Sequence, residues 1–262
     1  MNLLRRELRE GRVGLLGWTL GLAAAVIMYV PFYPSIGGSG MMETYLEAFP
    51  PEVARLFGFD RMATGAGYVH ASYFGLMAFL LLSIAAIGWG TRALAGAEAS
   101  GSLELTLAHG VTRWQVVLEG ALALLLRVAV VSAAASLVIW ALNGSAQLEL
   151  DPRGLVAVTF ALFLLASLTG AAALFGGAVS GRPGVVTGLG AGVAVAGYVL
   201  DAVADLAGAP WLARLSPYHW AFGSDPIVTG FDAGGLAALA AGFAVLVLAG
   251  GRLFSRRDLR SP

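Results

Sequence analysis

Long apolar runs alternate with short polar segments along this chain. A helix needs about 20 mostly apolar residues, at 1.5 Å of rise per residue, to cross the roughly 30 Å hydrocarbon core of a bilayer. Runs that meet this length and carry few or no charges are residues 13–33, 68–91, 114–142, 154–180, 185–206 and 233–253. The pattern predicts an all-α integral membrane protein in which residues 1–262 form a single domain with six transmembrane helices.

The polar segments predict shorter elements. Residues 1–12 carry four arginines, with leucines spaced so that one side is apolar. This arrangement is typical of an interfacial helix that leads into the first span. Pro31 and Pro34 are expected to end that span, because proline breaks the helical hydrogen-bond ladder. Between the first two spans, a short helix is expected over 41–49.

Residues 98–113, between the second and third spans, predict a short amphipathic helix rather than an irregular loop. Leu103 and Leu107 are four positions apart and therefore share one helical face. Glu98 and Glu104 come early in the segment, where the helix dipole favours anions. Two interpretations remain open: an ordinary interfacial loop helix, or a surface helix set crosswise beneath the bilayer to contact another protein.

The third span carries local signals of its own. Thr112, with Gln115 three residues later, forms a capping box that is expected to begin the helix. Glu119 and Arg127 lie eight positions apart, roughly 12 Å along one helical face. Charges inside a span are energetically expensive. They either pair with a neighbouring helix or reach the interface, or they contact a transported solute or couple protons.

Composition agrees with a membrane protein and removes several chemistries. The chain is 58% hydrophobic and 12% charged, with a mean hydropathy of +0.79. It has no cysteine, which excludes disulfides, thiolate catalysis and cysteine-ligated metals. All 16 basic residues are arginine, so a phosphate-binding Walker lysine and a Schiff-base lysine are excluded as well. The histidines lack metal-binding spacing, and no metal site is expected.

The distribution of arginine predicts the orientation. The loops that would share one side with both termini hold most of the arginines: Arg5, Arg6, Arg9, Arg12, Arg92, Arg113, Arg182, Arg252, Arg256, Arg257 and Arg260. The loops on the other side hold Arg55, Arg61, Arg153 and Arg214. Because cytoplasmic loops carry the excess of positive charge, both termini and residues 98–113 are expected in the cytoplasm.

Small residues recur every four positions where the fifth span begins, at Gly184, Gly188 and Gly192. Such a stripe lets another helix approach closely. The neighbour could belong to the same subunit or to a second copy of the chain, and the sequence leaves both options open.

Several motifs carry a resemblance to a known family. The segment between the second and third spans of ABC-2-type transporter permeases is similar to Glu98-x-x-Gly101-Ser102-Leu103-Glu104-x-x-Leu107-x-x-Gly110-x-Thr112-Arg113, with Gly110 where that family often has proline. The carboxyl end of the antibiotic- and polyketide-exporter branch resembles Leu215-Ser216-Pro217-Tyr218-His219-Trp220 followed, after the last span, by Phe254-Ser255-Arg256-Arg257-Asp258-Leu259. Residues 46–58 resemble the first outer loop of that branch. The resemblance covers nearly the whole chain.

The resemblance implies a permease similar to the type V ABC exporters, in the bacterial cytoplasmic membrane. It implies that residues 98–113 are a coupling helix seated on a separate ATP-binding subunit, through Glu98, Gly101, Leu103, Glu104, Leu107, Gly110, Thr112 and Arg113. The chain would pair with a second copy as a homodimer, bind no cofactor itself and leave ATP and magnesium to the partner subunit. It would therefore be a transport subunit and not an enzyme.

The same resemblance implies where cargo would move. In the family the path follows the dimer seam along the second and fifth spans, here 68–91 and 185–206. These spans are apolar and rich in Gly and Ala. A metal ion or sugar would need rings of polar ligands, so a hydrophobic or amphiphilic compound, such as an antibiotic, a drug or a lipid-like molecule, is the expected cargo. No nucleic-acid partner is expected.

Two other functions remain open. An ion-coupled secondary transporter could arise from three-plus-three inverted repeats with Glu119 or Arg127 as coupling charges, but the two halves show no matched pair of broken helices. An intramembrane serine protease is suggested by Gly37-Gly38-Ser39-Gly40. Its serine would need a histidine base inside the membrane, whereas Ser39 lies in a glycine-rich loop.

Overall fold

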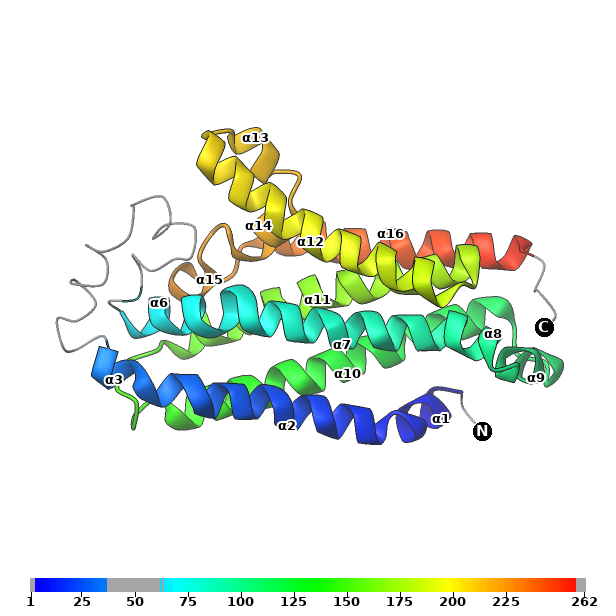
Figure 1. Ribbon diagram of the computed structural model, residues 1–262, viewed down its shortest axis with the longest axis horizontal. Coiled ribbons are helices and arrows are strands. Elements are labelled where there is room, and N and C mark those ends of the chain that lie inside the picture. The colour runs from blue at the N-terminus through cyan, green and yellow to red at the C-terminus, as the bar shows by residue number, and fades with distance from the viewer. Residues whose placement is uncertain (1–2, 37–61, 63, 258–262) are drawn as a thin grey trace.

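The computed structural model describes residues 3–36, 62 and 64–257, and every regular element within these ranges is a helix. Figure 1 shows the long helices lying along one another in an elongated bundle. Six helical segments are long and apolar enough to cross a membrane, which confirms the predicted six-span, all-α fold: Arg12–Ser35, Gly65–Ala99, Arg113–Leu142, Pro152–Ser180, Pro183–Ala207 and Ala233–Arg256. The expected helix at 41–49 and the glycine-rich sequence around Ser39 lie outside the described residues.

The first span ends near its prolines. It consists of α2 (Arg12–Tyr29), a 3₁₀ turn (Val30–Phe32) and α3 (Tyr33–Ile36), so helical structure continues through Pro31 and Pro34. The regular α-helix nevertheless ends at Tyr29, before Pro31, and the span ends at Ser35, so both prolines lie at the end of the span as predicted. Each proline falls in the first turn of a new short helical segment, where a missing backbone N–H leaves no hydrogen bond unmade.

The second span is longer than predicted. It runs through α6 (Gly65–Val69), a π-helical segment (His70–Ala78), α7 (Phe79–Thr91), a second π-helical segment (Arg92–Gly96) and α8 (Ala97–Ala99). The helix therefore continues past the apolar run and across Arg92. Glu98 lies in its last turn, not near the start of a separate helix as predicted.

The remaining spans are α10 (Arg113–Leu142), α11 (Pro152–Ser180), α12 (Pro183–Ala207) and α16 (Ala233–Arg256), and local sequence sets their ends. The capping box predicted at the start of α10 is confirmed, with the Thr112 hydroxyl accepting from the Gln115 N–H at 3.2 Å. α11 begins after Asp151, whose carboxylate accepts from the Gly154 N–H, and ends at Gly181 with φ of 63°. This left-handed conformation is one that glycine adopts without steric cost.

The helix α11 is the centre of the bundle, and most of its side chains are buried. The helices α2, α12 and α16 lie at the periphery and expose most of theirs. Where α7 crosses α11, Gly90 and Gly170 meet so closely that a Cβ on Gly90 would collide with the Gly170 carbonyl oxygen. Close approach of this kind holds helices together in lipid, where apolar burial alone gives little driving force between them.

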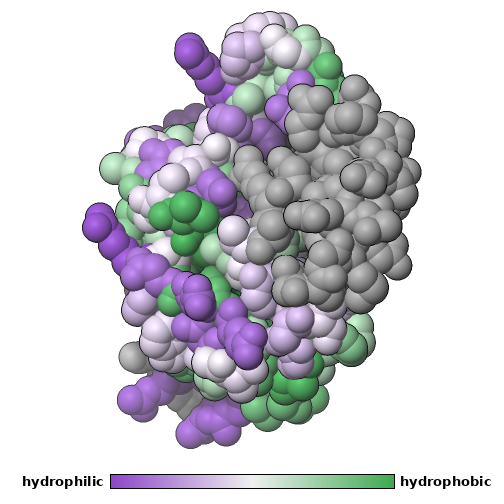
Figure 2. Space-filling view, turned by 90° about the vertical axis from the view of Figure 1, so that its left-hand side faces the viewer, coloured by the Kyte–Doolittle hydropathy of each residue, from purple (hydrophilic) through white to green (hydrophobic). Residues whose placement is uncertain are grey.

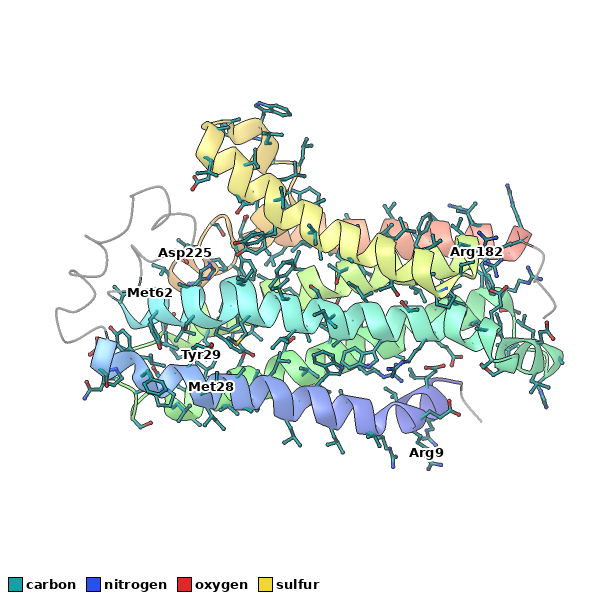
Figure 3. The ribbon with its side chains drawn as sticks, viewed as in Figure 1. Arg9, Met28, Tyr29, Met62, Arg182 and Asp225 are labelled. Atoms are coloured by element: carbon teal, nitrogen blue, oxygen red, sulfur yellow. The ribbon has the colours of Figure 1, made fainter. Side chains whose placement is uncertain are left out.

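The two ends of the bundle differ. One end carries α1 (Leu3–Glu10), the last residues of α16 and the short helix α9 (Ser102–Ala108), as Figure 1 shows. Arg9 and Arg182 lie near this end in Figure 3, whereas Tyr29, Met62 and Asp225 lie near the other. Figure 2 views the molecule from the end opposite α9 and shows hydrophilic residues mixed with apolar ones there.

The end opposite α9 is built from α13 (Pro210–Ala213), α14 (Pro217–Phe222) and α15 (Pro226–Thr229). Tyr218 anchors α14 to the bundle. Its hydroxyl donates to the Gly75 carbonyl oxygen at 2.7 Å, and its ring makes T-shaped contacts with Phe79 and Tyr198. The outer part of α12 and α13 lean away from the bundle (Figure 1).

Candidate functional site

The segment 98–113 forms a turn, a short helix and a second turn. Gly101, with φ of 70°, reverses the chain after α8, and α9 follows. Gly110, with φ of 82°, ends this connection before α10 begins. Proline is fixed near −65°, so it cannot adopt the conformation of Gly110. The turn at Gly110 is left-handed, a conformation open to glycine and closed to proline. This is how the chain can carry glycine at the position where the ABC-2 permeases, which it resembles, often have proline.

The leucines of α9 divide between two faces. Leu103 is 2% exposed and belongs to a buried cluster, and Leu107 packs partly against the same cluster. Both side chains thus hold α9 to its own subunit, whereas the sequence had suggested them for contact with a partner. The exposed face carries Glu104 and Leu105, and Leu105 is 65% exposed. Sequence reasoning missed Leu105, because helical spacing shows that it lies opposite Leu103 but not which face is buried.

Glu98 lies in a buried ion pair with Arg257. The side chains are only 10% and 18% exposed, respectively. Arg257 also donates to the carbonyl oxygens of Gly177 at 3.0 Å and Ala178 at 3.3 Å. These carbonyls belong to the last turn of α11, and that of Gly177 also accepts from the Gly181 N–H at 3.1 Å. Glu98 therefore joins the end of the second span to α16 and α11 and does not face outward, as a docking residue would.

Gly181 completes this arrangement, because a Cβ at its position would collide with the Glu98 carboxylate. Sequence reasoning used Arg257 only in the distribution of arginines and in the carboxyl-terminal motif of the resemblance. An acid at the end of one span and a basic residue at the end of another could have suggested an ion pair. Glu98 and Arg257 are 159 positions apart, however, and nothing in the sequence shows that these two residues meet.

Arg113 connects the start of α10 to the end of α16. Its guanidinium donates to the carbonyl oxygen of Phe254 at 2.9 Å and to that of Arg257. The ring of Phe254 is fully buried and lies 5.6 Å from the Arg113 guanidinium and 5.7 Å from that of Arg257. Cations over aromatic faces are attracted by the ring quadrupole. Both ends of the segment 98–113 are thus anchored at the carboxyl end of α16.

Glu119 and Arg127 bind the amino-terminal helix α1 at its first and last turns, respectively. The Leu4 N–H donates to the Glu119 carboxylate at 2.6 Å, and the Arg127 guanidinium donates to the Glu7 carbonyl oxygen. Arg127 also lies 3.6 Å from the Glu7 carboxylate, and its side chain is 6% exposed. An anion at the start of a helix and a cation at its end both interact favourably with the helix dipole. Glu119 and Arg127 thus contact a neighbouring helix, α1, which is the first of the two alternatives left open by the sequence.

The glycine stripe of α12 faces outward. Gly184, Gly188 and Gly192 are exposed, and a Cβ at any of them would have no atom within 4 Å. The intervening Gly190 faces inward instead, where a Cβ would lie 3.1 Å from the Thr169 carbonyl oxygen. The stripe therefore does not pack within the described part of its own subunit.

The fold and these contacts define a class of protein: a helical, multi-pass membrane protein with a short surface helix braced against three of its spans. The chain matches the family model described as ABC-2 family transporter protein over residues 1–259 and belongs to that family. It is therefore a membrane permease subunit of an ABC transporter, a class that works with an ATP-binding subunit. A search of curated proteins finds none that matches the chain.

Proposed function

We propose that this chain is the permease of an ATP-driven exporter that moves a hydrophobic or amphiphilic compound, such as an antibiotic, a drug or a lipid-like molecule, across a bacterial cytoplasmic membrane. Two copies would pair as a homodimer, and each would bind a separate ATP-binding subunit that holds the ATP and magnesium. The observation that carries this proposal is α9, which exposes Glu104 and Leu105 while its connections are fixed by buried ionic contacts.

The contacts of Glu98 and Arg113 would transmit a movement of α9 to other helices. A partner that moved α9 would act on α8 and α10, because both flank it in the chain. Through the Glu98–Arg257 pair and the Arg113 contacts, the same displacement would reach α16 and the end of α11. Rigid-body motion of packed helices is a known way to switch between two conformations. The arrangement therefore supports transmission from an ATP-binding subunit to several spans at once.

The outward stripe of α12 supports pairing with a second copy. Gly188 and Gly192 leave room for a helix to approach, and the adjacent Leu189 and Val195 are exposed apolar residues. Along the second span, Ile84 is 57% exposed and Gly88 also faces open space. A path between two such surfaces would have apolar walls, which suits an amphiphilic cargo better than a hydrated ion.

The orientation is also part of the proposal. The end that carries α9 also carries Arg9 and Arg182 (Figure 3) and the partly buried Arg113 and Arg257. By the positive-inside rule this end would face the cytoplasm, where an ATP-binding subunit has access to ATP.

The test is co-purification of the permease with its ATP-binding subunit from cells that express both. Leu105→Arg places a charge in the exposed face of α9 and is expected to abolish co-purification and cargo-stimulated ATP hydrolysis. Ser255→Arg is the matched control, since it adds the same charge at an exposed position of α16 at the same end. Normal co-purification of Leu105→Arg would contradict the docking role of α9, and equal loss in both variants would show that the effect is not local.

A further inference from the structure

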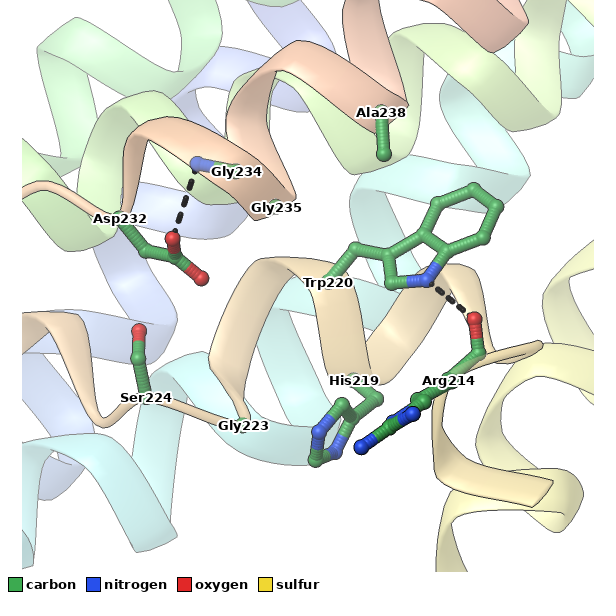
Figure 4. Close-up of a pocket in the computed structure, with 9 residues that line it drawn as sticks. All are labelled: Arg214, His219, Trp220, Gly223, Ser224, Asp232, Gly234, Gly235 and Ala238. Atoms are coloured by element: carbon green, nitrogen blue, oxygen red, sulfur yellow. Dashed lines mark hydrogen bonds between the residues drawn. The ribbon is translucent and has the colours of Figure 1, made fainter. Parts of the chain in front are cut away.

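The end of the bundle opposite α9 contains a second feature, a cavity of about 390 Å³ between α14 and the start of α16. Figure 4 shows its lining. Arg214 and Trp220 lie on one side of it, and Asp232 and Ser224 on the other. Neither the transport route proposed above nor the contacts around α9 involve this cavity.

Three polar groups that line the cavity keep some unused ion-pairing or hydrogen-bonding capacity among the described residues. The Arg214 guanidinium is exposed and makes no ion pair there. The Ser224 hydroxyl oxygen is buried and unpaired. The Asp232 carboxylate accepts from the Gly234 N–H with one oxygen, at 3.0 Å, and its second oxygen has no hydrogen bond. The described lining of the cavity therefore carries both a free cation and a partly free carboxylate.

The cationic side of the cavity is held in place by neighbouring contacts. The Trp220 indole N–H donates to the Arg214 carbonyl oxygen at 2.8 Å. His219 is fixed by Asp201, with 2.8 Å between its Nδ1 and a carboxylate oxygen. Figure 4 shows the Arg214 guanidinium lying beside the His219 ring. Because Asp201 already pairs with His219, Arg214 is, among the described residues that line the cavity, the cation left for an anionic group.

The side of the cavity formed by Asp232 favours a cationic group of a ligand. One carboxylate oxygen of Asp232 has no hydrogen bond within the described residues and carries negative charge, so it can accept a hydrogen bond from an ammonium group. The cavity therefore offers a cation at one end and an anion at the other. A zwitterionic ligand would satisfy both charges at once.

The position of the cavity indicates a lipid. Ala238, which also lines it, lies six positions after Asp232 in α16, so the cavity extends about 9 Å along that helix toward the middle of the bundle. Near Arg214, Trp211 is 63% exposed and Leu215 is 58% exposed, as is typical of residues at the boundary between headgroups and hydrocarbon. A headgroup bound at this level would have its acyl chains in the bilayer.

We propose that this cavity binds the headgroup of a zwitterionic phospholipid with a primary amine, its phosphate at Arg214 and its ammonium at Asp232. The bound lipid occupies the leaflet on the side opposite α9. Binding requires neither ATP nor the partner subunit, so it can be measured on the permease alone.

The test is lipid binding to the purified, full-length permease in detergent, measured by native mass spectrometry with phosphatidylethanolamine or phosphatidylglycerol added. Phosphatidylethanolamine is expected to bind about tenfold more tightly, since loss of one charge-assisted contact has about that effect. Arg214→Gln should weaken its binding about tenfold. Asp232→Asn should do the same, because asparagine keeps the helix cap and removes the charge, while phosphatidylglycerol binding should not fall.

Arg153→Gln is the matched control, because Arg153 is an exposed arginine at the same end but outside the cavity. It should change neither affinity by more than about twofold. Equal binding of the two lipids, an unaffected Arg214→Gln or Asp232→Asn variant, or an equal loss in the control would each overturn the proposal. Glycerophosphoethanolamine, which lacks acyl chains, should bind much more weakly; equal affinity would assign the site to a soluble zwitterion instead.

Discussion

The ion pair between Glu98 and Arg257 offers the sharpest test of how the α9 connection is held. In a Glu98→Gln variant the side chain keeps its size and one hydrogen-bond acceptor but loses its charge. Removing one partner of a fully buried pair typically costs about 3–5 kcal/mol. Here the side chains are 10% and 18% exposed and Arg257 retains its bonds to the α11 carbonyls, so a loss of about 2 kcal/mol in the free energy of unfolding is expected.

The assay is unfolding in mixed micelles of increasing SDS content, followed by tryptophan fluorescence. Glu104→Gln is the matched control, because it removes an exposed acid from the same segment and should change stability by less than about 0.5 kcal/mol. Arg257→Gln and the double variant complete a thermodynamic cycle. If the pair is as described, the double variant should lose about 1–2 kcal/mol less than the sum of the single variants.

Two results would refute this reasoning. Additive single effects would mean that Glu98 and Arg257 do not interact energetically. An equal loss in Glu104→Gln would mean that stability responds to the charge of the whole segment and not to the buried contact.

Three further predictions concern other contacts. Arg127→Gln should release α1 and speed tryptic cleavage at Arg9, and an unchanged cleavage rate would show that the Arg127 contacts do not hold this helix. Gly188→Leu should leave expression and thermal stability near normal but reduce dimer formation in crosslinking, whereas Gly190→Leu, which would clash within the subunit, should lower the yield of folded protein; the reverse pattern would contradict the assigned faces. Gly110→Pro should weaken co-purification with the ATP-binding subunit, since proline cannot adopt the left-handed turn, and wild-type binding would show that the turn is not needed.

The spans could be predicted from sequence because length and hydropathy alone decide which segments cross a bilayer. Their ends were readable where a local signal exists, as in the capping box at Thr112. The length of the second span was underestimated, because hydropathy reports only the apolar part of a helix. The apolar run ends at Arg92, but the helix continues to Ala99, because helical backbone hydrogen bonds can form in water as well as in lipid.

The contacts of the candidate site could not be predicted, because they join residues far apart in the sequence. Glu98 could be singled out by its motif, but its burial depends on Arg257, which arrives with the last helix. The spacing of Glu119 and Arg127 was visible, yet nothing local indicated that the helix between them in space would be α1. Helical period likewise placed Leu103 and Leu105 on opposite faces without saying which face is covered.

The contacts of Glu119 and Arg127 with α1 also determine when α1 can bind the bundle during synthesis of the chain. The contacts join residues 115 and 120 positions apart, so two spans must leave the ribosome before α1 has anything to bind. Until then the basic amino-terminal segment is free to remain at the membrane surface. When α10 enters the bilayer, its buried arginine meets a waiting carbonyl oxygen and carboxylate, which lowers the cost of inserting that charge.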